Sequence, residues 1–177
     1  AVIDRFRAEL ESRGVGVLYH PADVGKPDEI AAMIEAAQSR FGAVDILVNN
    51  AGITRDGLLV RMKEEDWNLV LQVNLNGTFH CTKAVMQPMT KQRYGRIVNI
   101  ASIVGVMGNV GQANYGSAKL GVVALARIIA MENQSKGITA NVIAPSADTR
   151  MTRSVPTPKD PAAAAAREER LRRSRAD

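Results

Sequence analysis

Cysteine, histidine and aromatic residues are scarce in this sequence, which holds one Cys, two His and 4% aromatic residues. The single Cys81 excludes a disulfide within the chain, and no Cys or His stands in a CxxC or HxxxH spacing typical of a metal site. No apolar run reaches the length of a membrane span, and the amino end lacks the character of a signal peptide. We therefore expect a cytoplasmic protein with no metal and no membrane among its partners, and with Cys81 buried on a helix.

A strong charge of one sign is also missing. The net charge of +5 is small, and much of it lies in the last stretch, REERLRRSRAD. Arg and Lys are not interleaved with aromatic residues, and no nucleic-acid-binding motif is present. The composition therefore argues against a nucleic-acid partner. An apolar fraction of 46% predicts instead an ordinary globular domain with a buried core.

Strand-like and helix-like patterns alternate along the chain. Continuous apolar runs indicate buried strands of a parallel sheet, and apolar residues at spacings of three and four indicate amphipathic helices. Gly14 and Gly42 follow two of the helical stretches and are expected to end them. The alternation predicts βαβ units, and so an open parallel sheet with helices on both faces. The expected helices are residues 1–13, 26–42, 63–92 with a break near Asn74, and 114–135, and the expected strands lie near Val15–Tyr19, Asp45, Ile97 and Asn141.

Tyr115 and Lys119 stand four positions apart in the stretch YGSAK. Residues at this spacing share one face of a helix, and a nearby ammonium favours the phenolate, which lowers the pKa of the phenol. Such a pair could act as a general acid. Taken alone, however, the spacing is more typical of a half-buried tyrosine beside a solvated lysine, so the interpretation depends on support from other residues.

The residues that follow each expected strand are candidates for a site, because ligands of open α/β sheets bind beyond the carboxyl ends of the strands. Ser102 follows one of these strands and precedes the helix of Tyr115, so both hydroxyls can converge on one substrate oxygen. Alone, Ser102 is more typical of a loop hydroxyl, and Asn74 of a capping or turn residue. The small or polar residues at the other strand ends are Asp23, Asn49, Asn50, Ala51, Gly52 and Pro145.

Together, the stretch NNAG, the Asn of NLNG, Ser102 and YGSAK resemble the short-chain dehydrogenase/reductase family, from Ile3 to about Met151. Within the family, NNAGITRDGLLVRM and VGVMGNVGQANY resemble most closely the 3-oxoacyl-acyl-carrier-protein reductases, whereas LYHPAD is closer to 3-hydroxybutyrate dehydrogenases. The resemblance implies a Rossmann-type doubly wound parallel sheet, with a partial dinucleotide-binding and catalytic domain at residues 1–155. Residues 156–177, rich in Ala and Arg, are expected to be a loosely attached helix or disordered.

The resemblance further implies hydride transfer between NADP or NAD and a carbonyl or hydroxyl carbon. Tyr115 would be the general acid and base, and Lys119 would lower its pKa and hold the nicotinamide ribose. Ser102 would orient the substrate oxygen, and Asn74 would hold a water that links Lys119 to solvent. The residues implied in cofactor binding are Asp23 at the adenine ring, Asn50, Ala51 and Gly52 in the groove, Tyr115 and Lys119 at the catalytic end, and Pro145 and Thr149 beside the nicotinamide.

The substrate that the resemblance implies first is a 3-oxoacyl thioester, with acyl carrier protein as a candidate partner. The alternative is the small free acid of a 3-hydroxybutyrate-type dehydrogenase. Members of the family commonly pair their long helices across two-fold axes, so a homo-oligomer, either a dimer or a tetramer, is expected.

The family's first strand, its Gly-rich TGxxxGxG turn and its second strand have no counterpart in the sequence, which also stops before the family's last strand. We therefore interpret the chain as a fragment that supplies the third to sixth strands and is inactive by itself. The other reading is a truncated, non-catalytic chain that acts only through helix-mediated association. With two strand positions empty, Val15–Tyr19 is expected either to lie about 14 Å from Asp45–Val48 or to pair with it directly.

Overall fold

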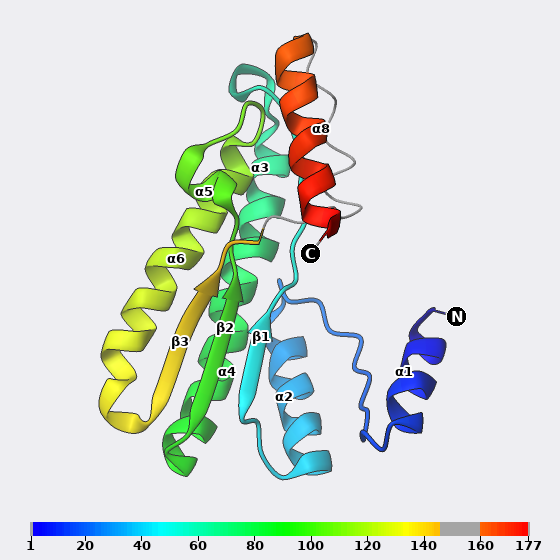
Figure 1. Cartoon of the computed structure of the whole chain (residues 1–177). Coiled ribbons are helices and arrows are strands. Elements are labelled where there is room, and N and C mark those ends of the chain that lie inside the picture. The colour runs from blue at the N-terminus through cyan, green and yellow to red at the C-terminus, as the bar shows by residue number, and fades with distance from the viewer. Residues whose placement is uncertain (1, 146–159, 177) are drawn as a thin grey trace.

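The structure is a computed structural model that describes residues 2–145 and 160–176 (Figure 1). Helices and strands alternate through most of its length. The elements are, in chain order, α1 Val2–Ser12, α2 Pro27–Phe41, β1 Ile46–Asn49, η1 Leu59–Arg61, α3 Glu64–Leu71, η2 Gln72–Asn76, α4 Gly77–Gln92, β2 Gly95–Ile100, α5 Ile103–Met107, α6 Ala113–Asn133, η3 Gln134–Lys136, β3 Ile138–Ile143 and α8 Pro161–Ala176.

Three parallel strands form the sheet, in the order β1-β2-β3. Ile46 of β1 lies opposite Arg96 of β2, and Gly95 of β2 lies opposite Ile138 of β3. Parallel neighbours need a long crossover connection, and the helices between the strands provide it. The carboxyl ends of the three strands therefore lie at one edge of the sheet. These strands confirm three of the four that the sequence predicts.

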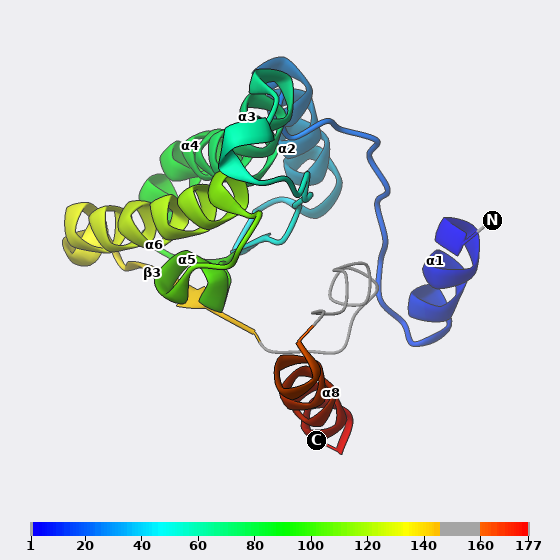
Figure 2. The same ribbon diagram turned by 90° about the horizontal axis from the view of Figure 1, so that it is seen from above.

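The helices α2, α4 and α6 form one layer against the sheet (Figures 1 and 2). Helix α6 packs on β2 and β3, α4 packs on β1 and β2, and α2 packs on α4. Right-handed crossovers that progress in one direction along a sheet place their helices on the same face. On the opposite face, Ile46 and Val48 of β1 are 60% and 56% exposed. Within the described residues, the layer thus covers one face rather than the two that the alternation predicts.

The hydrophobic core lies between this layer and the sheet. Val85 and Met89 of α4 and Ile97 of β2 are completely inaccessible to solvent. Cys81 is buried with them, as predicted, and burial raises the pKa of its thiol. Burying one such aliphatic side chain contributes about 1.5–3 kcal/mol, so this cluster holds the helix layer on the sheet. Its members are Ile30, Ile34, Cys81, Val85, Met89, Ile97, Ile129 and Ile138.

The long helical stretch between β1 and β2 is interrupted where the sequence predicts a break. Helix α3 ends at Leu71, and Gln72–Asn76 form a π-helical turn before α4 begins at Gly77. A π turn inserts an extra residue into the helical ladder, and such turns are frequent at functional sites. Asn74 lies in the middle of this turn and is completely buried.

One predicted strand does not form. Residues 15–20 are neither helix nor strand, and Val15 and Tyr19 are about half exposed. Apolar residues favour a strand only where a neighbouring strand pairs with their backbone groups and packs on their side chains. Within the described residues, β1 pairs with β2 and not with this segment. The prediction of a strand at Val15–Tyr19, and of its direct pairing with Asp45–Val48, is therefore wrong. The alternative, a separation of about 14 Å between these two segments, stays a prediction.

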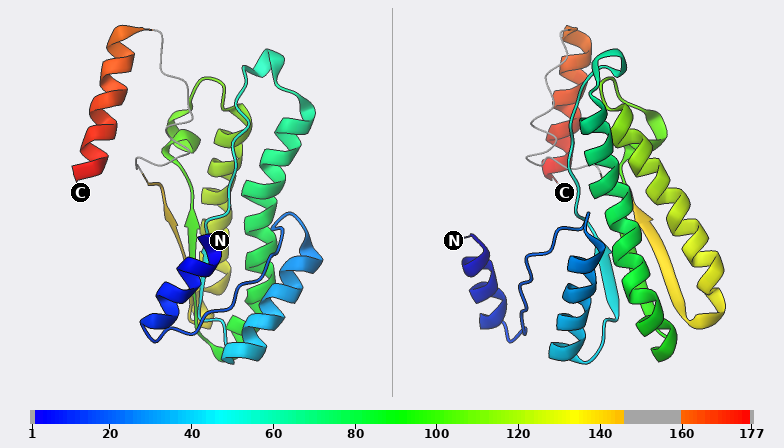
Figure 3. Two further views of the ribbon diagram at one scale, coloured as in Figure 1. Left: turned by 90° about the vertical axis from the view of Figure 1, so that its right-hand side faces the viewer. Right: turned by 180° about the vertical axis from the view of Figure 1, so that it is seen from behind.

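Helices α1 and α8 lie apart from the sheet and its helix layer (Figures 2 and 3). Helix α1 confirms the predicted first helix but buries none of its residues. Helix α8 belongs to the Ala- and Arg-rich stretch, and the division of the chain at residue 155 stays a prediction. In the part of the chain that the structure describes, no helix combines the length and apolar character needed to cross a bilayer.

We predict that Gly105→Ala destabilises the fold by about 1–3 kcal/mol, because overpacking at a tight contact forces the backbone apart. A Cβ at Gly105 of α5 would lie 2.8 Å from the backbone nitrogen of Leu120 in α6. The substitution should therefore push α5 away from α6. Urea unfolding of the variant and the parent measures the loss.

Gly116→Ala is the matched control, because it lies at the same contact between α5 and α6. A Cβ there would meet the Val104 oxygen at 3.4 Å, an ordinary contact. Alanine also favours a helix interior by up to about 1 kcal/mol over glycine. Equal stabilities for the Gly105 and Gly116 variants would contradict the close approach.

Candidate active site

Ser102, Tyr115 and Lys119 come together at the carboxyl end of β2. Ser102 follows this strand and caps the short helix α5, where its Oγ accepts a hydrogen bond from the Val104 N–H at 3.2 Å. Tyr115 and Lys119 lie in the first two turns of α6, which packs against both α5 and β2. The convergence of these three side chains agrees with the arrangement that the sequence predicts.

The hydroxyls of Ser102 and Tyr115 are hydrogen-bonded to each other. Only 8% of Tyr115 is exposed. Burial is the largest influence on Tyr115 and raises the pKa of its phenol, the bond to Ser102 lowers it, and the negative charge of Asp56 raises it further. The net effect is a raised pKa. Burial and the charge of Asp56 together outweigh the bond to Ser102, and the expected lowering of the Tyr115 pKa by Lys119 stays a prediction.

Lys119 faces Tyr115 across one helical turn, with its Nζ 5.7 Å from the centre of the phenol ring. The same Nζ donates a 2.7 Å hydrogen bond to the Ile100 oxygen at the end of β2. Only 4% of the residue is exposed, and this burial lowers the pKa of the ammonium to about 8. Lys119 can therefore exchange a proton near neutral pH.

Asn74 joins the π turn to the loop that follows β1. Its Nδ2 donates to the oxygens of Val70 and Ile53, both at 2.9 Å, and its Oδ1 accepts from the Ile53 N–H at 3.2 Å. A Cβ at Gly52 would lie 2.6 Å from Asn74 Oδ1 and 3.6 Å from Lys119 Nζ. The missing side chain of Gly52 thus lets this loop lie against both groups. The water that Asn74 is expected to hold stays a prediction.

Of the other residues predicted to bind a cofactor, four follow the ends of β1 and β3, Asp23 precedes α2, and one lies outside the described residues. Asn50 and Ala51 are exposed directly after β1, and Pro145 is exposed after β3. Asp23 closes its own turn before α2, since its Oδ1 accepts from the Gly25 N–H at 2.9 Å. Thr149 lies outside the described residues, and the cofactor roles of all these residues stay predictions.

Three polar residues beside the site were missed by the sequence analysis. Asn114 is completely buried and Gln112 is 5% exposed, and both precede Tyr115 directly or nearly so. Asp56, in the loop after β1, accepts hydrogen bonds from Gln112 Nε2 at 3.1 Å on both carboxylate oxygens. The signal in the sequence for these residues was the pair of amides, Gln112 and Asn114, in the stretch GQANY. Their partners lie more than forty positions away.

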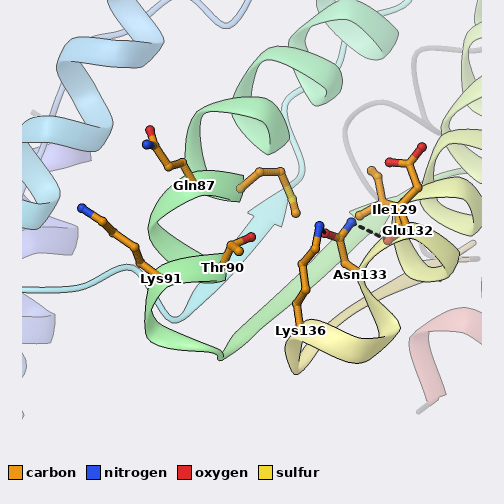
Figure 4. Close-up of a pocket in the computed structure, with 8 residues that line it drawn as sticks. Gln87, Thr90, Lys91, Ile129, Glu132, Asn133 and Lys136 are labelled. Carbon is orange, nitrogen blue, oxygen red and sulfur yellow. Dashed lines mark hydrogen bonds between the residues drawn. The ribbon is translucent and has the colours of Figure 1, made fainter.

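A separate hollow of about 450 Å³ lies between the ends of α4 and α6 (Figure 4). It includes none of the predicted site residues. On the wall of this hollow, Lys136 Nζ donates a hydrogen bond to Asn133 Oδ1 at 3.0 Å. The hollow is lined by Met86, Gln87, Thr90, Lys91, Ile129, Glu132, Asn133 and Lys136.

Comparison with known proteins places this arrangement in context. The family model for short chain dehydrogenases matches residues 2–160. A 3-oxoacyl-[acyl-carrier-protein] reductase FabG of Escherichia coli (strain K12) is 49% identical over 147 residues, which cover 82% of this chain and 59% of the relative. The 3-oxoacyl-[acyl-carrier-protein] reductase of Synechocystis sp. is 49% identical over 142 residues, which cover 80% of this chain and 58% of the relative. The chain thus spans somewhat under three-fifths of these relatives.

We predict that Lys119→Met removes a pH dependence of stability. The pKa of Lys119 is about 8 in the folded protein against an ordinary value of 10.5, so the unfolded chain holds the proton more tightly. Wild-type stability should therefore increase as the pH rises through this interval, by on the order of 3 kcal/mol. The variant should lack this increase. Urea unfolding at the two ends of this interval, about pH 8 and about pH 10.5, measures it.

Lys91→Met serves as the control, because Lys91 is an exposed lysine of α4. This control should reproduce the wild-type pH dependence. The lost bond to the Ile100 oxygen shifts the stability of Lys119→Met by about 1 kcal/mol at every pH, so the slope is the decisive quantity. Equal slopes in Lys119→Met and the wild type would show that Lys119 is not buried as described.

Proposed function

This chain belongs to the short-chain dehydrogenase family, and we propose that it carries the catalytic centre of an oxidoreductase that uses NADP or NAD. The reaction is hydride transfer between nicotinamide and a carbonyl or hydroxyl carbon. The convergence of Ser102, Tyr115 and Lys119 at the carboxyl end of β2 is the observation that supports it most directly. That edge of an open parallel sheet is where ligands of such folds bind.

The end of β1 is where the proposal places a nicotinamide dinucleotide. Asn50 and Ala51 are exposed there, and Gly52 beside them lies against Asn74 Oδ1 and Lys119 Nζ. In the proposal, a flat ring approaches the exposed backbone of Asn50 and Ala51, close to Lys119. When bound, the nicotinamide supplies or accepts the hydride. Asn50, Ala51 and Gly52 would line its groove, and Lys119 would donate hydrogen bonds to the ribose.

Tyr115 acts as the proton donor when a carbonyl is reduced. Its raised pKa keeps the phenol protonated at neutral pH, and its oxygen is already held by the hydroxyl of Ser102. Two hydroxyl donors on one carbonyl oxygen stabilise the negative charge that develops there in the transition state. Proton transfer by a positioned side chain contributes typically about 10²–10⁴-fold to the rate.

Lys119 and Asn74 support this step. With a pKa of about 8, Lys119 can return a proton toward Tyr115 at neutral pH. Asn74 fixes the loop at Ile53 through two hydrogen bonds and so fixes Gly52 beside Lys119. In the proposal, Asn74 also orients a water through which Lys119 exchanges protons with solvent.

For the substrate we favour a 3-oxoacyl thioester carried by acyl carrier protein. The relatives that are about half identical bear the name 3-oxoacyl-[acyl-carrier-protein] reductase. The loop after β1, with the sequence NNAGITRDGLLVRM, lies beside the catalytic residues and carries much of this resemblance. The protein would act in the cytoplasm as a homo-oligomer that pairs the faces of α4 and α6, where Phe79 of α4 and Leu120, Ile128 and Met131 of α6 are exposed.

The first functional prediction is that Tyr115→Phe, in the full-length protein that carries this sequence, abolishes nearly all turnover. The change removes the proton donor but keeps the ring, so cofactor affinity should stay within about threefold. Steady-state kinetics with NADPH or NADH, together with the fluorescence of the bound reduced cofactor, measures the two effects separately.

Tyr94→Phe is the control for removal of a phenol hydroxyl, because Tyr94 is exposed at the other end of the sheet and stacks on Arg96. It should keep wild-type turnover. A Tyr115→Phe variant within about tenfold of the wild type, a loss of less than about 1.4 kcal/mol, would refute the assignment of Tyr115.

The second functional prediction is that acetoacetyl thioesters are reduced with a higher kcat/KM than free acetoacetate. A thioester lacks the carboxylate that a 3-hydroxybutyrate-type dehydrogenase binds, and its carrier provides contacts remote from the reacting carbon. Comparing the two substrates at a fixed NADPH concentration tests the choice. Preference for the free acid would overturn it in favour of the alternative dehydrogenase.

A further inference from the structure

Two segments far apart in sequence are tied together directly before Tyr115. The Gly57 N–H, in the loop after β1, donates to the Gly111 oxygen at 2.8 Å, and Gly57 and Gln112 form an isolated parallel bridge. Asn114 Nδ2 donates to the Arg55 oxygen at 2.9 Å in the same loop. Figure 3 shows this loop running beside the start of α6. The position of the first turn of α6 therefore depends on the loop.

The side chain of Gln112 makes the only contact between these segments that involves a charged group among the described residues. Its Nε2 donates to both oxygens of the Asp56 carboxylate at 3.1 Å, and its Oε1 accepts from Asn109 Nδ2 at 2.8 Å. Gln112 is also the residue directly before α6, and its side chain caps none of that helix's own N–H groups. Hydrogen bonds to a charged partner are stronger than neutral ones.

We propose that Gln112 and Asp56 form a positioning pair that holds Tyr115 against Ser102 for proton transfer. The pair joins Gln112, directly before α6 and three positions before Tyr115, to a loop that Asn74 holds at Ile53. This inference rests on the proposed function, because positioning matters for turnover only if Tyr115 is the proton donor. Neither residue touches the reacting atoms in the proposal. Their effect reaches the chemistry through the placement of Tyr115.

Asn114 supports the inference from the other side of the helix start. Its Oδ1 accepts from the Tyr115 N–H at 2.8 Å, and its Nδ2 also reaches the Asp66 oxygen of α3 at 3.3 Å. Both amides that precede Tyr115 thus tie the start of its helix to segments outside α6. A misplacement of about 1 Å in a reacting group can lower a rate about 10²-fold, which is why such anchoring affects catalysis.

The carboxylate of Asp56 also acts on Tyr115 through its charge. Its negative charge raises the pKa of the phenol and thereby opposes ionisation. The other groups that face this phenol are the Ser102 hydroxyl and the Lys119 ammonium. Arg55, next to Asp56, forms a salt bridge to Asp66, with 4.0 Å between Arg55 Nε and Asp66 Oδ1. Removing the charge of Asp56 should therefore shift ionisation of Tyr115 to lower pH.

The test exchanges the two polar groups of the pair in the full-length protein. Gln112→Glu keeps the size of the side chain but sets one carboxylate against another, so the contact should break. We expect kcat to fall about tenfold or more, with a smaller change in KM for NADPH. Combining Gln112→Glu with Asp56→Asn restores a donor and an acceptor in reversed order. This combination should recover most of the lost kcat.

Gln92→Glu provides the matched control. Gln92 Nε2 donates to Asp45 Oδ1 at 3.2 Å, so the control sets two carboxylates together at the opposite end of the sheet. It should reproduce any loss of stability without the loss of kcat. Thermal unfolding of each variant identifies one that fails to fold, and the combined variant then carries the test. A Gln112→Glu variant with wild-type kcat, or a combined variant no faster than Gln112→Glu alone, would overturn the proposal.

A second readout separates this inference from the proposed function. Ultraviolet difference absorbance follows the phenolate of Tyr115, with the Tyr115→Phe variant as the baseline, and needs no substrate. Asp56→Asn should move the ionisation of Tyr115 to lower pH, while Asp45→Asn should leave it in place. If the wild type reduces no 3-oxoacyl substrate but this shift occurs, the proposed function fails and the pairing stands. If turnover is present and the shift is absent, the pairing is refuted.

Discussion

Parallel pairing of β2 with β1 and β3 is the constraint on which the rest of the structure depends. The pairing sets Asn49 opposite Asn99, and a buried hydrogen bond of 2.9 Å joins Asn49 Nδ2 to Asn99 Oδ1. A slip of one residue would break this bond and turn every side chain to the other face of the sheet. The amide of Asn49 also donates to Thr82 Oγ1 on α4, at 3.1 Å. The two bonds of Asn49 therefore fix the register of β1 on β2 together with the position of α4. The carboxyl ends of the strands then lie at one edge of the sheet.

Close packing then brings Ser102, Tyr115 and Lys119 to this edge. Gly105 lets α5 lie against the backbone of α6, and Gly52 lets the loop after β1 lie against Asn74 and Lys119. Such contacts exclude water from Tyr115 and Lys119, which shifts both groups toward their neutral forms. Burying an amine in this way reduces the stability of the fold at neutral pH. The burial of the aliphatic core behind the site contributes the folding stability that offsets this loss.

Local patterns in the sequence were sufficient to predict most of this arrangement. Three strands, the interruption at Asn74 and the convergence of Ser102 with Tyr115 all follow from periodicity and from the rule for strand ends. The segment Val15–Tyr19 was misjudged because an apolar pattern cannot show whether a neighbouring strand will pair with it. The raised pKa of Tyr115 was not predicted, because the spacing in YGSAK shows a nearby lysine but neither the burial of the phenol nor the charge of Asp56. Gln112 and Asp56 were missed because their contact joins positions fifty-six residues apart.

Under the proposed function, burial of Tyr115 and Lys119 has a consequence for the direction of the reaction. It raises the pKa of the Tyr115 phenol and lowers that of the Lys119 ammonium to about 8, so near neutral pH the phenol keeps its proton, while Lys119 stays largely charged and exchanges its proton readily. Negative charge that develops on a carbonyl oxygen here is stabilised strongly, because the surrounding dielectric is low. The protonated phenol and the Ser102 hydroxyl would then act as preorganised donors to that oxygen. In the proposed reaction the arrangement is therefore suited to reduction at neutral pH, whereas oxidation of an alcohol needs the phenolate and is favoured as the pH rises.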